Sequence, residues 1–438
     1  MGSAEVAVIG VLVIAYAAVS MRIEHWPLTM PMVFMGAGLL FDLAGWIDVS
    51  ADVGAIALLA EITLAVILFS DAVRIDLRGL RRFLGIPARL LGIGLPLTVL
   101  MGAWVNSLLF PDLPFAQVAL LAAILAPTDA ALGAAVVEDE SVPVRERLGL
   151  NVESGVNDGL VVPVVAILTA VVLNENQSTS SWAGFIAQQI GWGVVLGVVV
   201  GGGAITVLRW AAQRGWSDAR FEQLATFVVP IVALFGASAI SGNSFIAAFV
   251  AGLTFGSLGH DRDGDGMATT PLSERLDAFT EDAGQLLAIG AFFVFGNVLL
   301  PDVLDHITVA VVACALLTLT VGRMLPVWIS LIGTSTKAPT RIFIGWFGPR
   351  GLASVVFGLL LLEETEVTSE LGAVGDELFG VIALTVTASV LLHGASAAPG
   401  ARAYGRWAAK QDDDDDRDKV EMKMVEVAMP RGRWSLRR

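Results

Sequence analysis

The segment LAPTDAALGAAVVEDESVPVRERLGLNVESGVNDGLVVPVV, which runs from Leu125 to Val165, places acidic side chains in the middle of two apolar stretches. Asp129 lies within the first stretch, and Glu153 and Asp158 lie within the second. A charged group in apolar surroundings costs free energy unless it is paired or used. The acids of this segment therefore indicate a functional site rather than ordinary packing.

The rest of the chain has the composition of a polytopic membrane protein. Of its 438 residues, 55% are hydrophobic and 16% are charged, whereas a soluble domain carries about 25% charged residues. The apolar residues come in runs of about 20, the length with which a helix crosses a bilayer. A single cysteine, Cys314, allows no internal disulfide. We expect no cofactor, no transition-metal site and no nucleic-acid partner, because neither ligand spacing nor a basic surface is present.

We expect an all-α fold with about thirteen transmembrane helices. Loops after odd-numbered spans hold nearly all the arginine and lysine residues, as in 74–82 and 209–222, and the loops after even-numbered spans hold none. The positive-inside rule then places the N-terminus outside and the C-terminus in the cytoplasm. The expected spans are 4–20, 27–43, 53–71, 86–110, 115–137, 148–173, 182–209, 222–240, 243–258, 282–300, 307–332, 340–361 and 376–398.

Two of these spans are interrupted at corresponding places. Pro127 breaks the fifth span, and the sequence GPRG at 348–351 breaks the twelfth. Each is the middle of a triple of spans, and the odd offset between the triples gives them opposite topologies. Paired broken helices in inverted repeats are typical of secondary transporters. Their ends expose main-chain groups that need charged partners, and Asp129 and Arg350 are placed to supply them.

The sixth span carries two polar pairs on neighbouring faces. Ser154 and Asp158 are four residues apart, as are Glu153 and Asn157, and this spacing places each pair on one side of a helix. Arg350 lies in mid-span, where an arginine is costly without an acidic partner. We expect Glu153 to be that partner, which leaves Asp158 as the free acid.

With APTDA, then ESGVNDG, and GPRG far downstream, the chain resembles the sodium/proton antiporters of the cation:proton antiporter superfamily, NhaP type, over about residues 1–398. The resemblance implies that Asp158 carries the ion and the proton. It also implies a structural set at the site, consisting of Glu153, Asn157 and Arg350. Further ion ligands would be Thr128, Ser154, Asp129 and Asp71, the last with a shorter arm than the glutamate usual in the family, so that its direct contact with the ion stays open.

The same resemblance implies the function. The protein would be an antiporter and not an enzyme, exchanging one Na⁺, or Li⁺, for one H⁺ by alternating access, without net charge movement, in pH homeostasis at the cell membrane. It would be a homodimer in the lipid bilayer. Core helices at about 86–173 and 307–398 would move as an elevator against interface helices at about 4–71 and 182–300. The tail, 399–438, would be a charged cytoplasmic segment open to a regulator.

Two alternatives stay open at this point. A K⁺/H⁺ antiporter of the same fold would carry the same motifs, since sites for the two ions differ only in ring size and in the placement of the ligand oxygens. A carrier that couples an organic solute to protons or sodium would need a wider pocket. An intramembrane aspartyl protease is disfavoured, because the only two tyrosines, Tyr16 and Tyr404, are not near an acid of interest.

Overall fold

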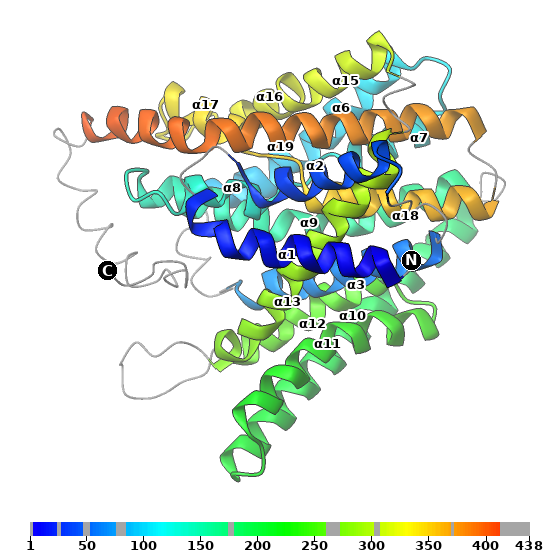
Figure 1. Ribbon diagram of the computed structural model, residues 1–438, viewed down its shortest axis with the longest axis vertical. Coiled ribbons are helices and arrows are strands. Elements are labelled where there is room, and N and C mark those ends of the chain that lie inside the picture. Colours follow the sequence, from blue (N-terminus) through cyan, green and yellow to red (C-terminus); the bar gives the residue numbers. More distant parts are fainter. Residues whose placement is uncertain are drawn as a thin grey trace.

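The computed structural model is a bundle of long helices, and the expected all-α fold is confirmed (Figure 1). No strand occurs within the residues described here. Those residues are 3–23, 28–46, 53–75, 85–173, 179–259, 272–301, 307–368 and 372–411.

Each of the thirteen expected spans overlaps one, two or three consecutive helices. The first half of the described chain forms α1 (Ser3–Ile23), α2 (Met30–Leu43), α3 (Val53–Val73), α5 (Gly85–Arg89), the π-helix η1 (Leu90–Gly94), α6 (Leu95–Leu109), α7 (Phe115–Ile124), α8 (Ala130–Val137), α9 (Val144–Leu173) and α10 (Thr179–Gln213). The second half forms α11 (Ala219–Ala239), α12 (Ser244–Gly259), α13 (Leu272–Val294), the π-helix η2 (Phe295–Leu299), α15 (Val309–Leu319), α16 (Val321–Ser330), α17 (Ala338–Trp346), α18 (Leu352–Thr368) and α19 (Gly372–Ala409).

Membrane crossing is supported by length and composition. Among the described residues, eight helical segments are long and apolar enough to cross a membrane, and shorter apolar helices occupy the remaining expected spans. The chain is therefore a multi-pass membrane protein, while the count of thirteen crossings stays a prediction.

Glycines allow α10, α12 and α3 to pack backbone against backbone. A Cβ added to any of three α10 glycines would meet a main-chain carbonyl oxygen of α12 or of Asn243, the residue before it. On the last of the three it would collide with the carbonyl oxygen of Ala251. Gly252 and Gly256 of α12 approach α3 in the same way. The glycine-rich stretch of the seventh span thus serves close helix packing within the chain, as small residues do in membranes. The three α10 glycines are Gly193, Gly197 and Gly201.

Buried side chains form a large shared core and smaller local clusters. One local cluster, which includes Ile86, Val142 and Tyr404, draws only on α5 to α9 and α15 to α19. Another, which includes Phe69 and Phe255, draws only on α3 and α10 to α13. The largest cluster joins both groups. The expected division into core and interface helices stays a prediction.

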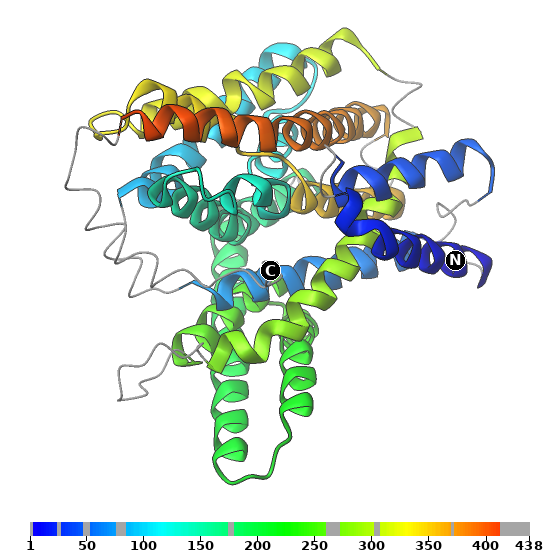
Figure 2. The same cartoon turned by 60° about the vertical axis from the view of Figure 1, so that its left-hand side comes forward.

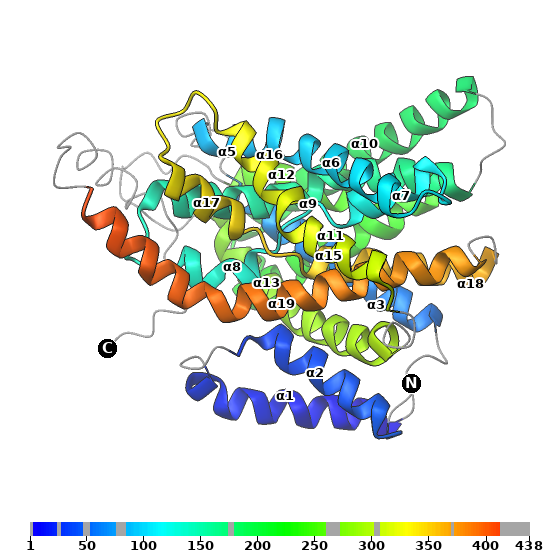
Figure 3. The same cartoon turned by 90° about the horizontal axis from the view of Figure 1, so that it is seen from above.

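The last helix extends further than expected. α19 contains 38 residues, so its length is about 57 Å, which exceeds a bilayer core of about 30 Å. It crosses the bundle diagonally when seen from above, while α1 and α2 form one edge (Figure 3). Tyr404 stacks on Phe343 of α17 with ring centroids 4.0 Å apart, and its hydroxyl lies 2.9 Å from that of Thr340. The first residues of the expected tail are thus a packed part of this helix.

Candidate functional site

The two expected interruptions meet in space. α7 ends at Ile124 and α8 begins at Ala130, while α17 ends at Trp346 and α18 begins at Leu352. The main-chain N–H of Asp129, in the first interruption, donates to the carbonyl of Pro349, in the second, at 2.8 Å. We call the two interruptions, 125–129 and 347–351, the crossing.

Arg350 lies at the centre of the crossing and is fully buried. Its Nη1 donates to the carbonyl oxygens of Ala126 and Pro127, at 2.6 and 3.0 Å. These carbonyls follow the C-terminal end of α7, where the helix dipole favours a positive charge. Ser354 of α18 donates to a further α7 carbonyl, that of Ile124, at 2.7 Å.

Asp129 supplies the opposite charge to the opposite helix ends. Its Oδ2 accepts a hydrogen bond from the N–H of Leu352, at 2.7 Å, and its Oδ1 accepts one from Leu132, at 3.1 Å. The carboxylate therefore binds the first turns of α18 and α8, where a negative charge is favoured. Gly351 permits this approach, because a Cβ there would collide with Asp129 Oδ2. The expectation that Asp129 and Arg350 supply the broken ends with charge is confirmed.

The expected pairing of Glu153 with Arg350 is wrong. Glu153 binds Arg323 of α16 through two parallel hydrogen bonds, Nη1 to Oε1 at 2.5 Å and Nη2 to Oε2 at 2.7 Å. Both side chains are only 2% exposed. Gly348 makes room for this arginine, since a Cβ at that position would collide with the Arg323 guanidinium. Arg350 instead donates from Nη1 to two carbonyls at a helix end, and its Nε and Nη2 have no hydrogen-bond partner among the described residues.

The polar residues of α9 face the first interruption. Ser154 and Thr128 place their hydroxyl oxygens 3.1 Å apart, and Asn157 Nδ2 donates to Thr128 Oγ1 at 2.6 Å. Asp158, one residue further, is buried, and its Oδ1 has no hydrogen-bond partner within the described part of the chain. Hydroxyl, amide and carboxylate oxygens are the ligands that hard cations prefer, so this group of side chains is suited to a cation.

Asp71 lies near the C-terminal end of α3. Asp71 and Asp129 are the charged groups that act electrostatically on Asp158. The structure thus gathers three carboxylates around one position, although only Asp129 is bound to main-chain donors of both broken helices. A direct contact between Asp71 and a bound ion stays a prediction.

Sequence reasoning missed an acidic pair beside Asp71. α13 begins at Leu272, ten residues before the expected span, and carries Asp277 and Glu281. Ser70 donates to Asp277 Oδ2 at 2.6 Å, and Arg74 forms ion pairs with both acids. The charged stretch LSERLDAFTED reads as a loop by hydropathy alone, but its apolar residues Leu276 and Phe279 recur at helical spacing.

Ser389 and His393 of α19 were also not among the expected site residues. Ser389 Oγ accepts a hydrogen bond from the main-chain N–H of Arg350 at 2.6 Å, and it lies 3.2 Å from His393 Nδ1. The imidazole ring packs on Trp346, with centroids 4.8 Å apart. α19 therefore contacts residues on both sides of the second interruption. The sequence signal for this contact was the pair of polar residues, Ser389 and His393, on one face of an apolar span.

Two broken helices that cross at buried charges are typical of ion-coupled secondary transporters, and this is the class of protein to which the fold points. Residues 8–403 match the family described as "Sodium/hydrogen exchanger, transmembrane". The chain belongs to this family.

Relatives and solved structures agree with this assignment. The chain is 27% identical to the K(+)/H(+) antiporter NhaP2 of Shewanella baltica (strain OS223) over 83% of its own length and 59% of the relative's. It is also 27% identical to the Na(+)/H(+) antiporter NhaP of Pseudomonas aeruginosa (strain PAO1), over 77% and 78% of the two chains. The chain thus spans about three fifths of the length of NhaP2.

The fold is similar to that of a solved antiporter. The sodium proton antiporter MjNhaP1 from Methanocaldococcus jannaschii superposes with a TM-score of 0.74 over 91% of this chain and 97% of that one, at 18% identity. At this identity the likeness concerns the fold alone.

Proposed function

We propose that the chain exchanges a monovalent cation for a proton across a membrane, with Asp158 as the group that carries each in turn. The observation that supports this most directly is the buried Asp158 carboxylate, whose Oδ1 has no hydrogen-bond partner among the described residues. A carboxylate in such surroundings is costly when it is charged and empty. A proton or a cation removes that cost, and the two compete for one place.

The cost of the empty carboxylate is what couples the two fluxes. A site that changes its exposure from one side of the membrane to the other crosses readily only when it is neutralised. In one direction the proton neutralises Asp158, and in the other direction the cation does. For the cation, Ser154 and Thr128 supply oxygens in place of water, and Asp129 and Asp71 contribute charge.

A one-to-one exchange follows from what the neighbouring groups can do. Glu153 is held by both nitrogens of Arg323, and Asn157 cannot ionise. Asp129 is fixed by two main-chain donors. The one-to-one exchange also requires Asp71 to keep one protonation state throughout. Asp158 is then the group whose proton content changes during the cycle, so that no net charge crosses the membrane.

We assign Na⁺ as the principal cation and K⁺ as the second candidate. The second is favoured by relatives that are named K(+)/H(+) antiporters, and the first by relatives named Na(+)/H(+) antiporters. We further propose a homodimer in the cell membrane with the N-terminus outside, in which the helices around the crossing move as an elevator against α1 to α3 and α10 to α13.

Transport in proteoliposomes tests this function. Purified protein is reconstituted with a pH-sensitive dye inside, and NaCl, LiCl, KCl or choline chloride is added outside. We expect proton efflux on addition of Na⁺, none with choline, and none in Asp158→Asn. Asp112→Asn, which removes an exposed aspartate in the loop between α6 and α7, is the matched control and should transport normally. Normal exchange by a well-folded Asp158→Asn protein would overturn the assignment.

A further inference from the structure

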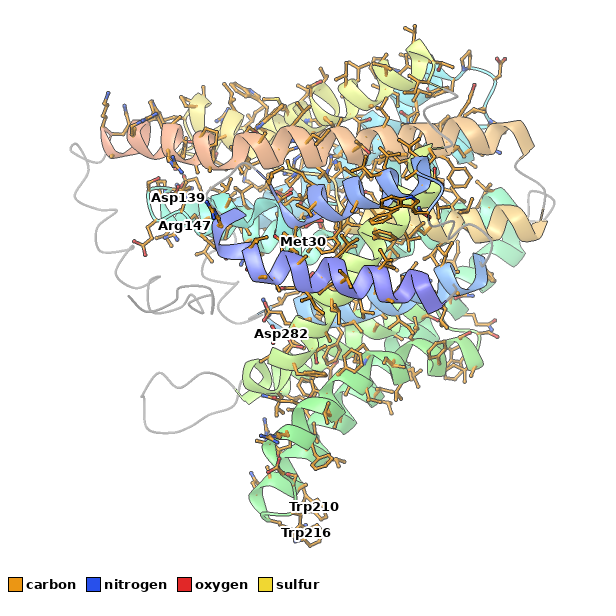
Figure 4. The ribbon with its side chains drawn as sticks, viewed as in Figure 1. Met30, Asp139, Arg147, Trp210, Trp216 and Asp282 are labelled. Carbon is orange, nitrogen blue, oxygen red and sulfur yellow. The ribbon has the colours of Figure 1, made fainter. Side chains whose placement is uncertain are left out.

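The hairpin of α10 and α11 ends in a tip that lies apart from the ion site. The hairpin projects from the rest of the bundle in two views (Figures 1 and 2). Trp210 and Trp216 lie at its far end (Figure 4). We call residues 209–222, with the sequence RWAAQRGWSDARFE, the α10–α11 tip.

An arginine is held between two exposed tryptophans at the tip. The Arg214 guanidinium carbon lies 4.2 Å from the ring centroid of Trp210 and 5.6 Å from that of Trp216. The two indoles meet edge to face at 4.9 Å. Trp216 and Phe221 are each 71% exposed. Stacking uses the face of the guanidinium and leaves its N–H edge directed outward.

The turn that builds this arrangement is rigid. Gly215 adopts a positive φ of 66°, its N–H donates to the carbonyl of Ala212, and the N–H of Trp216 donates to that of Ala211. This pair of hydrogen bonds defines a Schellman motif, which ends a helix in a fixed geometry. Trp216 is thereby returned towards Trp210 before any partner binds.

The acids of the tip are engaged within the tip itself. Asp218 caps α11 by accepting from the N–H of Arg220, at 2.9 Å, and Glu222 accepts a hydrogen bond from Ser217. Within the described residues, the guanidinium groups of Arg214 and Arg220 have no hydrogen-bonded or ionic partner. The tip thus presents two arginines with free donors beside three exposed aromatic rings.

We propose that the α10–α11 tip binds the headgroup of an anionic glycerophospholipid, with the lipid phosphate on the free N–H edge of Arg214. Arginine binds phosphate through two parallel charge-assisted hydrogen bonds. Tryptophan rings are enriched at the level of the headgroups, where one end is apolar and the other is wet. The cytoplasmic side expected for this loop carries the anionic lipids that basic segments attract. The lipid site is independent of the ion site and of the proposed transport.

Lipid titration of the full-length protein tests this assignment. Protein in a neutral detergent is titrated with palmitoyl-oleoyl phosphatidylglycerol or with the matched phosphatidylcholine, and bound lipid is counted by native mass spectrometry. The wild type should prefer phosphatidylglycerol. Arg214→Gln should weaken phosphatidylglycerol binding about tenfold, the effect of one lost charge-assisted contact, and leave phosphatidylcholine unchanged. Arg406→Gln, at another exposed arginine, is the control.

Further variants separate the alternatives. Arg214→Lys keeps the charge but lacks the flat guanidinium that stacks on the rings. Its affinity for phosphatidylglycerol should therefore lie between those of the wild type and Arg214→Gln. It replaces Arg214→Gln in the titration if that variant does not fold. An unchanged preference for phosphatidylglycerol in both variants would overturn the proposal. It would also fail if inorganic phosphate displaced the lipid completely, or if the variants altered only the oligomeric state, because the tip would then bind free phosphate or a second chain.

Discussion

Arg350 and Asp129 each hold the broken helix to which the other belongs. Arg350 donates to the carbonyls of Ala126 and Pro127 at the end of α7, and Asp129 accepts from the N–H of Leu352 at the start of α18. The interaction is reciprocal although the two side chains are not bound to each other. Each charge compensates main-chain groups that the break leaves without helical partners.

Replacing Asp129 with alanine should destabilise the protein by at least about 2 kcal/mol, because two main-chain donors lose a charged acceptor, each worth about 1.5–3 kcal/mol. Thermal unfolding in detergent measures the loss. Asp129→Asn retains one acceptor oxygen and should lose less. Equal stability of the alanine and asparagine variants would show that the carboxylate does not hold the crossing.

Arg323→Met should destabilise the protein by about 3–5 kcal/mol, since it leaves Glu153 buried without its cation. The double variant Arg323→Met/Glu153→Met should recover most of that loss, because an apolar pair replaces the ion pair. Thermal unfolding of the two single variants and the double variant gives the coupling. A double variant no more stable than Arg323→Met would contradict the pairing.

The packing of α10 on α12 predicts opposite effects at neighbouring glycines. Gly201→Leu should destabilise the protein by about 1–3 kcal/mol, because the added side chain meets the main chain of Ala251. At Gly203 an added Cβ meets nothing within 4 Å, so Gly203→Ala should be neutral or stabilising by up to about 1 kcal/mol. Unfolding temperatures that ranked the two variants the other way would show that α10 does not pack as described.

Exchange should not depend on the membrane potential if Asp158 alone changes its proton content. Only net moved charge feels the potential, at about 2.3 kcal/mol per 100 mV. Vesicles with a sodium gradient should therefore change their internal pH at the same rate with and without a potassium diffusion potential set by valinomycin. A clear dependence of the rate on the potential would mean that a second carboxylate, Asp129 or Asp71, also exchanges its proton.

The sequence was sufficient to locate the crossing but not to pair its charges. Pro127 and the GPRG sequence mark the interruptions because proline and glycine disrupt helical hydrogen bonding wherever they lie. Arg323 and Arg350 both lie in mid-span, and hydropathy treats them alike. Which of them reaches Glu153 depends on how α16 is rotated after the irregular backbone at Thr320, where φ is −107° and ψ is −91°. That rotation is set by packing between helices.

Helix ends were harder to predict than helices. The charged residues of α13 suggested a loop, yet Asp277 is buried against Ser70 because tertiary contacts satisfy it. At the other end of the chain, the charged residues beyond 398 suggested an exit from the membrane. The helix continues because Tyr404 finds a stacking partner in Phe343. Neither partner, Ser70 or Phe343, can be identified from the sequence around the residue that it contacts.

The long α19 has a mechanical consequence. This single helix contacts the second interruption through the hydrogen bond of Ser389. It contacts α17 through Tyr404, before the described chain ends at Gln411. Whatever follows Gln411 is therefore joined covalently to the helix that contacts Arg350. A label or a bound protein placed there would therefore act on α19, the helix whose Ser389 binds the main chain of Arg350.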